Sequence, residues 1–110
     1  MTTVTNAVII VSMKAVKLIQ TRIVYPESAF AEFVLWRLPK QSSGVFHEFK
    51  YRLAYMVSSK CVLRYDDETS KGDHRHLDGK ERPYQFTTPE QLIVDFQKDI
   101  ERWNHENRNP

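Results

Sequence analysis

Two histidines stand in a short polar segment in the second half of the chain, residues 65–76, beside fixed positive charges. His74 and His76 are two residues apart, and Lys71 and Arg75 lie next to them. Histidine can both accept and donate a proton near neutral pH. In metal-free RNA cleavage one group deprotonates the ribose 2′-hydroxyl, a second protonates the leaving oxygen, and cations stabilise the added negative charge. The segment therefore predicts phosphodiester cleavage, with the two histidines sharing the acid and base roles.

A neighbouring hairpin is expected to supply further residues to this site. With a two-serine turn at Ser58 and Ser59, Arg52 would lie opposite Tyr65, so that a cation and a phenol share one face of the hairpin. We expect Arg52, like Lys71 and Arg75, to stabilise phosphate, and Tyr65 to orient the substrate or donate a proton. The cations expected to bind RNA are Lys50, Arg37 and Arg64.

The charge distribution also favours an anionic partner. Residues 37–82 carry ten Lys/Arg against seven Asp/Glu, whereas residues 83–110 carry three against five. A basic middle part indicates that one surface faces a polyanion. A solvated surface of mixed charge is the alternative interpretation.

A metal site is the chemical alternative to metal-free cleavage. The His-x-His spacing supplies two ligands on one side of a strand, whereas zinc sites need three or four. Asp66, Asp67 and Glu68 could hold magnesium, although three consecutive acids are more often exposed turn residues. We therefore predict no metal and no other cofactor. A metal-dependent nuclease, using the histidines with Asp73 or with Asp66 and Asp67, stays open, as does a purely structural polar loop.

The elements that position these residues are strands followed by one helix. Strand patterns cover residues 14–24, 29–38, 47–57 and 61–65, and residues 83–86 could add a fifth strand. For the helix, Thr88 is the expected N-cap, with Pro89 at the first position and Gln91 completing a capping box. The helix is expected to end near Asn104. Its apolar stripe consists of Leu92, Ile93, Phe96, Ile100 and Trp103.

This order predicts an α+β fold: an antiparallel sheet of four to five strands with one C-terminal amphipathic helix packed on one face. The histidine segment would be a loop that the sheet holds at both ends.

The size and composition fit one soluble domain. The chain has 110 residues, of which 41% are hydrophobic and 27% charged. Its single cysteine, Cys61, cannot form an intramolecular disulfide, which favours a reducing cytoplasm. No apolar run approaches the roughly 20 residues that cross a membrane. We predict a domain at residues 13–105, preceded by an extension at 1–12 that is an added strand or a tail, and followed by a frayed tail at 106–110.

Five blocks of sequence follow one another in a specific order. They are residues 34–39, 47–55, 62–66, 71–76 and 83–86. Together they resemble the TumE family of bacterial toxin-antitoxin proteins over about residues 13–103, and the block Lys-Gly-Asp-His-Arg-His is the most specific. Asp67 departs from the pattern, in which an amide residue is expected. The resemblance implies a small toxin encoded beside an antitoxin with a helix-turn-helix DNA-binding part, and RNA cleavage is the activity expected of such toxins.

The sequence thus predicts a cytoplasmic toxin that is a metal-independent endoribonuclease, with RNA and a cognate antitoxin as partners and no membrane association. A homodimer formed through residues 1–12 stays open. One alternative is a non-catalytic protein that binds nucleic acid or a partner, whose affinity for RNA would fall steeply with salt. The other is a metal-dependent nuclease, which a chelator would inactivate.

Overall fold

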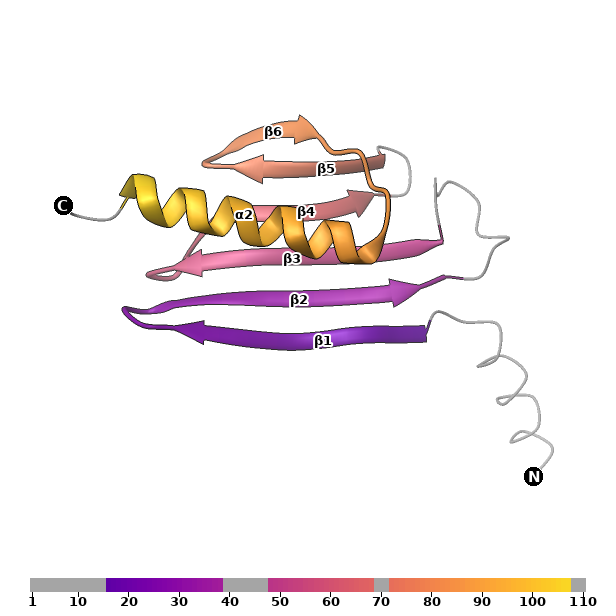
Figure 1. Cartoon of the computed structure of the whole chain (residues 1–110), viewed down its shortest axis with the longest axis horizontal. Helices are drawn as coiled ribbons and strands as arrows, with labels where there is room; N and C mark the ends of the chain where they lie inside the picture. Colours follow the sequence, from indigo (N-terminus) through magenta and orange to yellow (C-terminus); the bar gives the residue numbers. More distant parts are fainter. Residues whose placement is uncertain (1–15, 39–47, 69–71, 108–110) are drawn as a thin grey trace, which may run out of the picture.

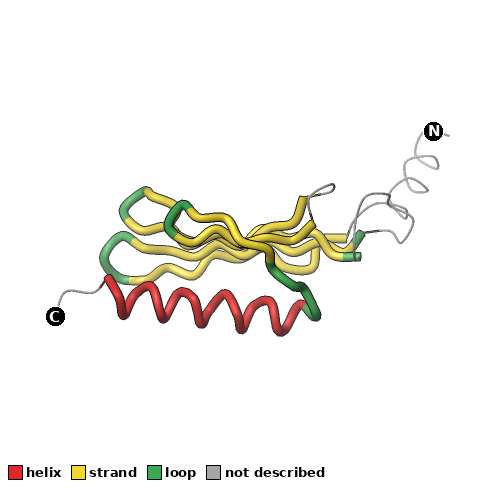
Figure 2. The backbone as a smooth tube through the Cα atoms, turned by 90° about the horizontal axis from the view of Figure 1, so that it is seen from above, coloured by secondary structure: helices red, strands yellow, loops and turns green. Residues whose placement is uncertain are grey.

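The computed structural model describes residues 16–38, 48–68 and 72–107. These residues form one antiparallel sheet in which each strand pairs with the next along the chain, in the order β1-β2-β3-β4-β5-β6 (Figure 1). The elements are β1 (Val16–Tyr25), β2 (Ala29–Arg37), β3 (Phe49–Val57), β4 (Lys60–Glu68), β5 (Gly72–Leu77), β6 (Lys80–Pro83) and α2 (Pro89–Asn107). The helix lies along one face of the sheet and forms a second layer (Figure 2).

The predicted α+β class, with one C-terminal helix on an antiparallel sheet, is confirmed, but the prediction of four to five strands is wrong because the sheet has six. The two histidines do not lie in a loop, because the described residues of their segment, 65–68 and 72–76, belong to β4 and β5. Asp78 and Gly79 form the next turn, with φ angles of 52° and 84°. Positive φ at both turn residues is typical of the two-residue hairpin turn that Asp-Gly favours, and β6 follows directly. Of the suggested strand at residues 83–86, only Pro83 is in β6.

The β1–β2 and β3–β4 hairpins also have turn residues with positive φ, but without glycine; the first turn has three residues, 26–28, and the second has two. Glu27 and Ser28 have φ angles of 64° and 65°, and Ser58 and Ser59 have 50° and 67°. The predicted Ser58-Ser59 turn is therefore confirmed. Left-handed backbone strains any residue with a Cβ atom, so both turns store a small amount of free energy.

Replacing Ser59 by glycine is expected to raise the free energy of unfolding by about 0.5–1 kcal/mol, because glycine adopts positive φ without a Cβ clash. Urea unfolding of the two proteins measures the difference. Ser59→Ala, which retains the Cβ atom, is the matched control and should give no gain. A glycine variant no more stable than the alanine variant would contradict the strain at this turn.

The helix begins as the sequence predicts. The Gln91 backbone N–H donates to Thr88 Oγ1 at 3.1 Å, which confirms Thr88 as the N-cap, and Pro89 is the first helical residue. The helix ends at Asn107, beyond the predicted end near Asn104, so residues 106 and 107 of the predicted tail are helical. Residues 108–110 lie outside the described residues, as does the extension at 1–12. No helix in the described part of the chain is long and apolar enough to span a membrane.

The core lies between the helix and strands β2 to β4. The predicted stripe is confirmed, since Leu92, Phe96 and Ile100 are buried and Ile93 and Trp103 pack at its edge. Phe96 is fully buried and meets the rings of Phe33 and Tyr65 edge-on, each at 5.4 Å between ring centroids. Edge-on contacts of this kind stabilise a core beyond the area they bury. The helix is therefore fixed over the middle of the sheet.

A β-bulge changes the register between β3 and β4. The bulge inserts Val62 into β4, and beyond it Arg52 pairs with Asp66 while Leu53 pairs with Tyr65. The predicted pairing of Arg52 with Tyr65 is therefore wrong. Because one extra residue moves side chains to the other face of a strand, Arg52 and Tyr65 lie on opposite faces of the sheet.

Candidate active site

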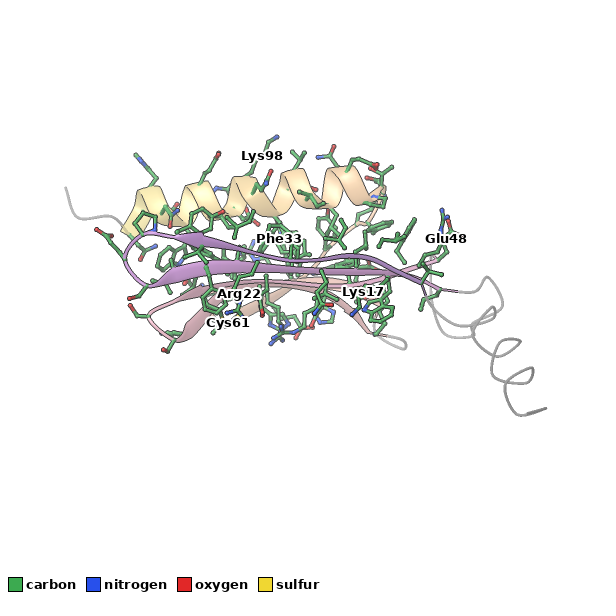
Figure 3. All side chains as sticks on the ribbon, turned by 90° about the horizontal axis from the view of Figure 1, so that it is seen from below. Lys17, Arg22, Phe33, Glu48, Cys61 and Lys98 are labelled. Atoms are coloured by element: carbon green, nitrogen blue, oxygen red, sulfur yellow. The ribbon has the colours of Figure 1, made fainter. Side chains whose placement is uncertain are left out.

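The sheet has one face covered by α2 and one without it, which we call the open face. Figure 3 shows Phe33 between the sheet and the helix, and Lys17 and Arg22 on the opposite side. Side chains alternate between the faces along each strand. The alternation and the strand register place His74 and His76 on the open face, together with Arg52.

Strand pairing brings a set of charged residues to the two histidines. Asp66 is the direct partner of His74 across β4 and β5, and Arg64 is the partner of His76. From β6, Glu81 pairs with His76. We call these five residues, Arg64, Asp66, His74, His76 and Glu81, the histidine cluster.

His74 is the buried member of the cluster, with 4% of its surface exposed. Its Nδ1 atom lies 3.3 Å from the Gly72 carbonyl oxygen, which can only accept, so Nδ1 carries a hydrogen and donates it. Its Nε2 atom lies 2.9 Å from Asp66 Oδ1 and 3.7 Å from Glu81 Oε2. The ring is thus held at both nitrogens, with Nε2 facing two carboxylates.

His76 is half-buried and faces a cation instead. Its Nε2 atom lies 3.0 Å from Arg64 Nη2. A guanidinium can only donate, so Nε2 of His76 accepts and carries its lone pair there. Arg64 also reaches Asp66, with 3.3 Å between Nε and Oδ2. The two imidazole rings are 5.1 Å apart between centroids, so two groups able to move protons stand side by side.

A pocket of about 260 Å³ adjoins the cluster on the open face. It is lined by Val34, Trp36, Lys50, Tyr51, Arg52, Asp66 and Asp67. Asp66 belongs to both the pocket and the cluster, so a ligand in the pocket would lie beside His74. Lys50 is an exposed cation whose Nζ atom donates to the Asp67 carbonyl oxygen at 3.4 Å, and Arg52 is also exposed. Two cations next to a tryptophan ring can hold a phosphate group and stack a base.

Tyr65 and Arg75 lie on the other face, beneath the helix. The Tyr65 hydroxyl donates to Asp99 of α2, and Arg75 Nη1 lies 3.2 Å from both the Tyr65 oxygen and Asp99 Oδ2. Burial and the hydrogen bond to Asp99 raise the pKa of Tyr65 above its usual value, so its hydroxyl stays protonated. This buried network joins β4 and β5 to the helix.

The other predicted site residues do not all lie on the same face of the sheet. Lys50 and Arg64 lie on the open face, whereas Arg37 is on the helix side of β2, where Nη2 contacts Glu48 Oε2 at 3.2 Å. Lys71 lies outside the described residues. Sequence reasoning missed Glu81 and placed Asp66 only in the metal alternative. The signal that could have found both is strand alternation combined with the Asp-Gly turn, which brings β6 next to β5.

A larger pocket of about 600 Å³ lies near the turns that join β1 to β2 and β3 to β4. Its lining residues are Tyr25, Pro26, Glu27, Ala29, Tyr55, Val57, Trp103, Asn104 and Asn107. Among these lining residues, all from the described part of the chain, Glu27 is the one charged side chain and none is a histidine. The lining of this larger pocket therefore lacks the phosphate-binding cations that RNA cleavage needs.

The fold and the cluster define a small α+β domain that carries its candidate site on the exposed face of a sheet. The family model described as Toxin TumE matches residues 7–104 of the 110. The chain therefore belongs to the TumE toxin family, and the predicted resemblance is confirmed. The match begins ahead of Met13. No curated protein and no solved structure matches the chain. Membership identifies a toxin and, in general terms, an antitoxin as its partner.

Proposed function

We propose that this toxin is an endoribonuclease that cleaves RNA without a metal ion at the histidine cluster. The observation that supports the proposal is the pair of histidine Nε2 atoms, one 2.9 Å from the Asp66 carboxylate and the other 3.0 Å from the Arg64 guanidinium, beside a pocket with two exposed cations. A base and an acid on one open surface, next to phosphate-binding groups, are the parts that RNA cleavage requires.

In this proposal Lys50 and Arg52 bind the phosphate, and Trp36 stacks a neighbouring base. Arg64 turns from His76 to the phosphate, and the lone pair on His76 Nε2 accepts the proton of the ribose 2′-hydroxyl. The 2′-oxygen forms a bond to phosphorus, and the bond from phosphorus to the 5′-oxygen breaks. His74 gives that oxygen the proton on Nε2, which Asp66 and Glu81 face. The products are a 2′,3′-cyclic phosphate and a free 5′-hydroxyl.

The proposal assigns different roles to the remaining predicted residues. Arg64 contacts His76 and stabilises the added charge on the phosphate. Tyr65 and Arg75 are assigned to holding α2 on the sheet, because they lie on the helix side. Two contacts stay predictions: that of Lys71 with phosphate and that of Arg37 with RNA.

The direct test is incubation of the purified chain with total cellular RNA, with and without EDTA. The expected result is cleavage of equal extent in both, with fragments that end in cyclic phosphate. Loss of cleavage in EDTA and its return with added metal would favour the metal-dependent nuclease. No cleavage in either sample would overturn the proposal in favour of a binding role.

The phosphate-binding role of the pocket can be tested separately. Arg52→Gln is expected to weaken RNA binding and to lower the slope of log affinity against log salt by about 0.7, the value for one phosphate contact on a single strand. Fluorescence anisotropy with a labelled RNA at several salt concentrations measures both. The matched control is Arg22→Gln, on the same face, where Arg22 pairs with Glu32 at 2.6 Å. Equal slopes for native protein and Arg52→Gln would exclude the pocket as the phosphate site.

A non-catalytic binding protein is the second candidate function, and the same basic pocket favours it.

The helix-turn-helix character of the antitoxin, a homodimer and a cytoplasmic location also stay predictions. An exposed edge strand fits a partner strand, since its backbone groups are open on one side. β1 is such an edge, with Val16, Leu18, Ile23 and Val24 exposed.

A further inference from the structure

We infer that Asp66, His74 and His76 bind a divalent transition-metal ion, which displaces the Arg64 guanidinium and switches the toxin off. The binding site stands on geometry alone. The inhibition rests on the proposed function, because the ion would occupy both Nε2 atoms that move protons.

The three side chains are close enough to share one ion. Each offers one ligand atom, and these atoms all lie within 4.8 Å of one another. Ligand bonds of 2.0–2.2 Å to a tetrahedral ion separate neighbouring ligands by about 3.3 Å. The 2.9 Å between His74 Nε2 and Asp66 Oδ1 is already near that value. Small side-chain rotations of the half-buried His76 would complete the set.

Both histidines direct Nε2 into the cluster, and binding of the ion releases the proton that the proposed mechanism assigns to His74 Nε2. A metal-binding histidine usually donates its other N–H to a carbonyl or carboxylate oxygen, which fixes the ring and its tautomer. His74 makes this contact through Nδ1 and the Gly72 carbonyl oxygen, which leaves Nε2 for the ion. His76 Nε2 carries a lone pair because it accepts from Arg64. Neither ring needs to flip.

Asp66 supplies a second, independent indication. Its Oδ1 atom is buried and has no hydrogen-bond partner of acceptable geometry within the described residues, although His74 Nε2 is only 2.9 Å away. A buried carboxylate oxygen without a donor is costly. A metal ion between Oδ1 and Nε2 would satisfy both atoms. Glu81 Oε2 lies 3.7 Å from the same nitrogen on a side chain that is 47% exposed, so it can move to become a fourth ligand.

Arg64 stands in the place of a cation. Its guanidinium contacts His76 Nε2 and Asp66 Oδ2, two of the three ligand residues. Its side chain is 34% exposed, so it can turn out to solvent. Because two positive charges cannot share this space, the ion and Arg64 must compete. Competition of this kind makes metal occupancy a reversible switch.

The ligand chemistry selects the class of ion. Two imidazole nitrogens with one or two carboxylate oxygens suit zinc and similar first-row divalent ions. Magnesium and calcium prefer oxygen ligands throughout. Zn²⁺ is therefore the appropriate probe, and Mg²⁺ is the control ion.

The experiment measures Zn²⁺ binding to the full chain without RNA, by competition with a chromogenic chelator. We expect one ion at the site, a loss of affinity of tenfold or more in His76→Ala, and a gain of about tenfold in Arg64→Gln. Urea unfolding of Arg64→Gln establishes that the gain belongs to the folded protein, because an unfolded chain can also bind Zn²⁺ through exposed histidines. His105→Ala, in the last turn of α2, is the matched control and should bind as the native protein does. Mg²⁺ should not compete.

If His76→Ala and Arg64→Gln both bound Zn²⁺ with the native affinity, the proposed metal site would be wrong. In a second arm, Zn²⁺ is added to the RNA cleavage reaction, where it should inhibit and EDTA should restore activity. If Zn²⁺ instead stimulated RNA cleavage, the proposed inhibition would be wrong, but the metal site itself would still be supported. Zn²⁺ binding with the predicted variant pattern, but without cleavage under any condition, would support the site while the proposed function failed.

Discussion

Replacing His76 with alanine is expected to reduce RNA cleavage by a factor of roughly 10² to 10⁴, the usual contribution of a positioned proton-transfer group. The reason is the lone pair on Nε2, which accepts from Arg64 and becomes the proton acceptor when Arg64 turns to the phosphate. His76 is half-buried and contacts Arg64 rather than the core, so the free energy of unfolding should change little. Initial cleavage rates on a defined RNA, together with urea unfolding, measure both quantities.

The control for this prediction is again His105→Ala, an exposed histidine far along the helix, which should cleave at the native rate. His74→Ala should also lose activity, but His74 is buried and its removal would in addition lower stability. The His76 variant is therefore the cleaner test. A His76→Ala protein that is folded and cleaves like the native chain would remove this residue from the mechanism.

Asp99→Ala is expected to lower the free energy of unfolding by about 3 kcal/mol, because it removes the acceptor at the centre of a buried network. Asp99 is 5% exposed, and it accepts from Tyr65 and Arg75 and lies 3.6 Å from Arg102. Without the carboxylate, a buried hydroxyl and a half-buried guanidinium lose their partner. The midpoint of urea unfolding and its slope give the change in free energy.

Asp99→Asn distinguishes the loss of a hydrogen bond from the loss of charge. The amide oxygen can still accept from Tyr65, so this variant should lose less stability than Asp99→Ala. Its folded fraction should cleave RNA at the native rate, since the network lies on the helix side of the sheet. A drop in cleavage larger than the drop in folded protein would instead return Tyr65 and Arg75 to the catalytic set.

The helix could be predicted closely because all its signals are local. Thr88 and Pro89 mark its start, and the apolar spacing from Leu92 to Trp103 fixes the face that docks. The strands were harder at the histidine segment. Its residues are polar on the open face and, at Arg75, also on the helix side, so no apolar alternation marks β5. The Asp-Gly pair at residues 78 and 79 is the one local signal from which β5 and β6 could have been predicted as a hairpin.

The candidate site could be predicted only in part. The pairing of His74 and His76 follows from their spacing, because residues two apart on a strand share a face. Their charged neighbours depend on register between strands, which spacing within one segment does not contain. The separation of Arg52 from Tyr65 depends on the single inserted residue Val62. Nothing in the local sequence distinguishes that bulge from a regular strand.

The strand order has a consequence for how the chain acquires its structure. Within residues 16–38, 48–68 and 72–107, each strand pairs with its neighbours in sequence, so the sheet can assemble hairpin by hairpin with short loop closures. The helix is the exception, because it returns from the end of the chain to cover β2 to β4. During synthesis every residue of the histidine cluster emerges before the helix that covers the core. The nascent sheet thus exposes its apolar face until the last element is made, and α2 is the step that completes folding.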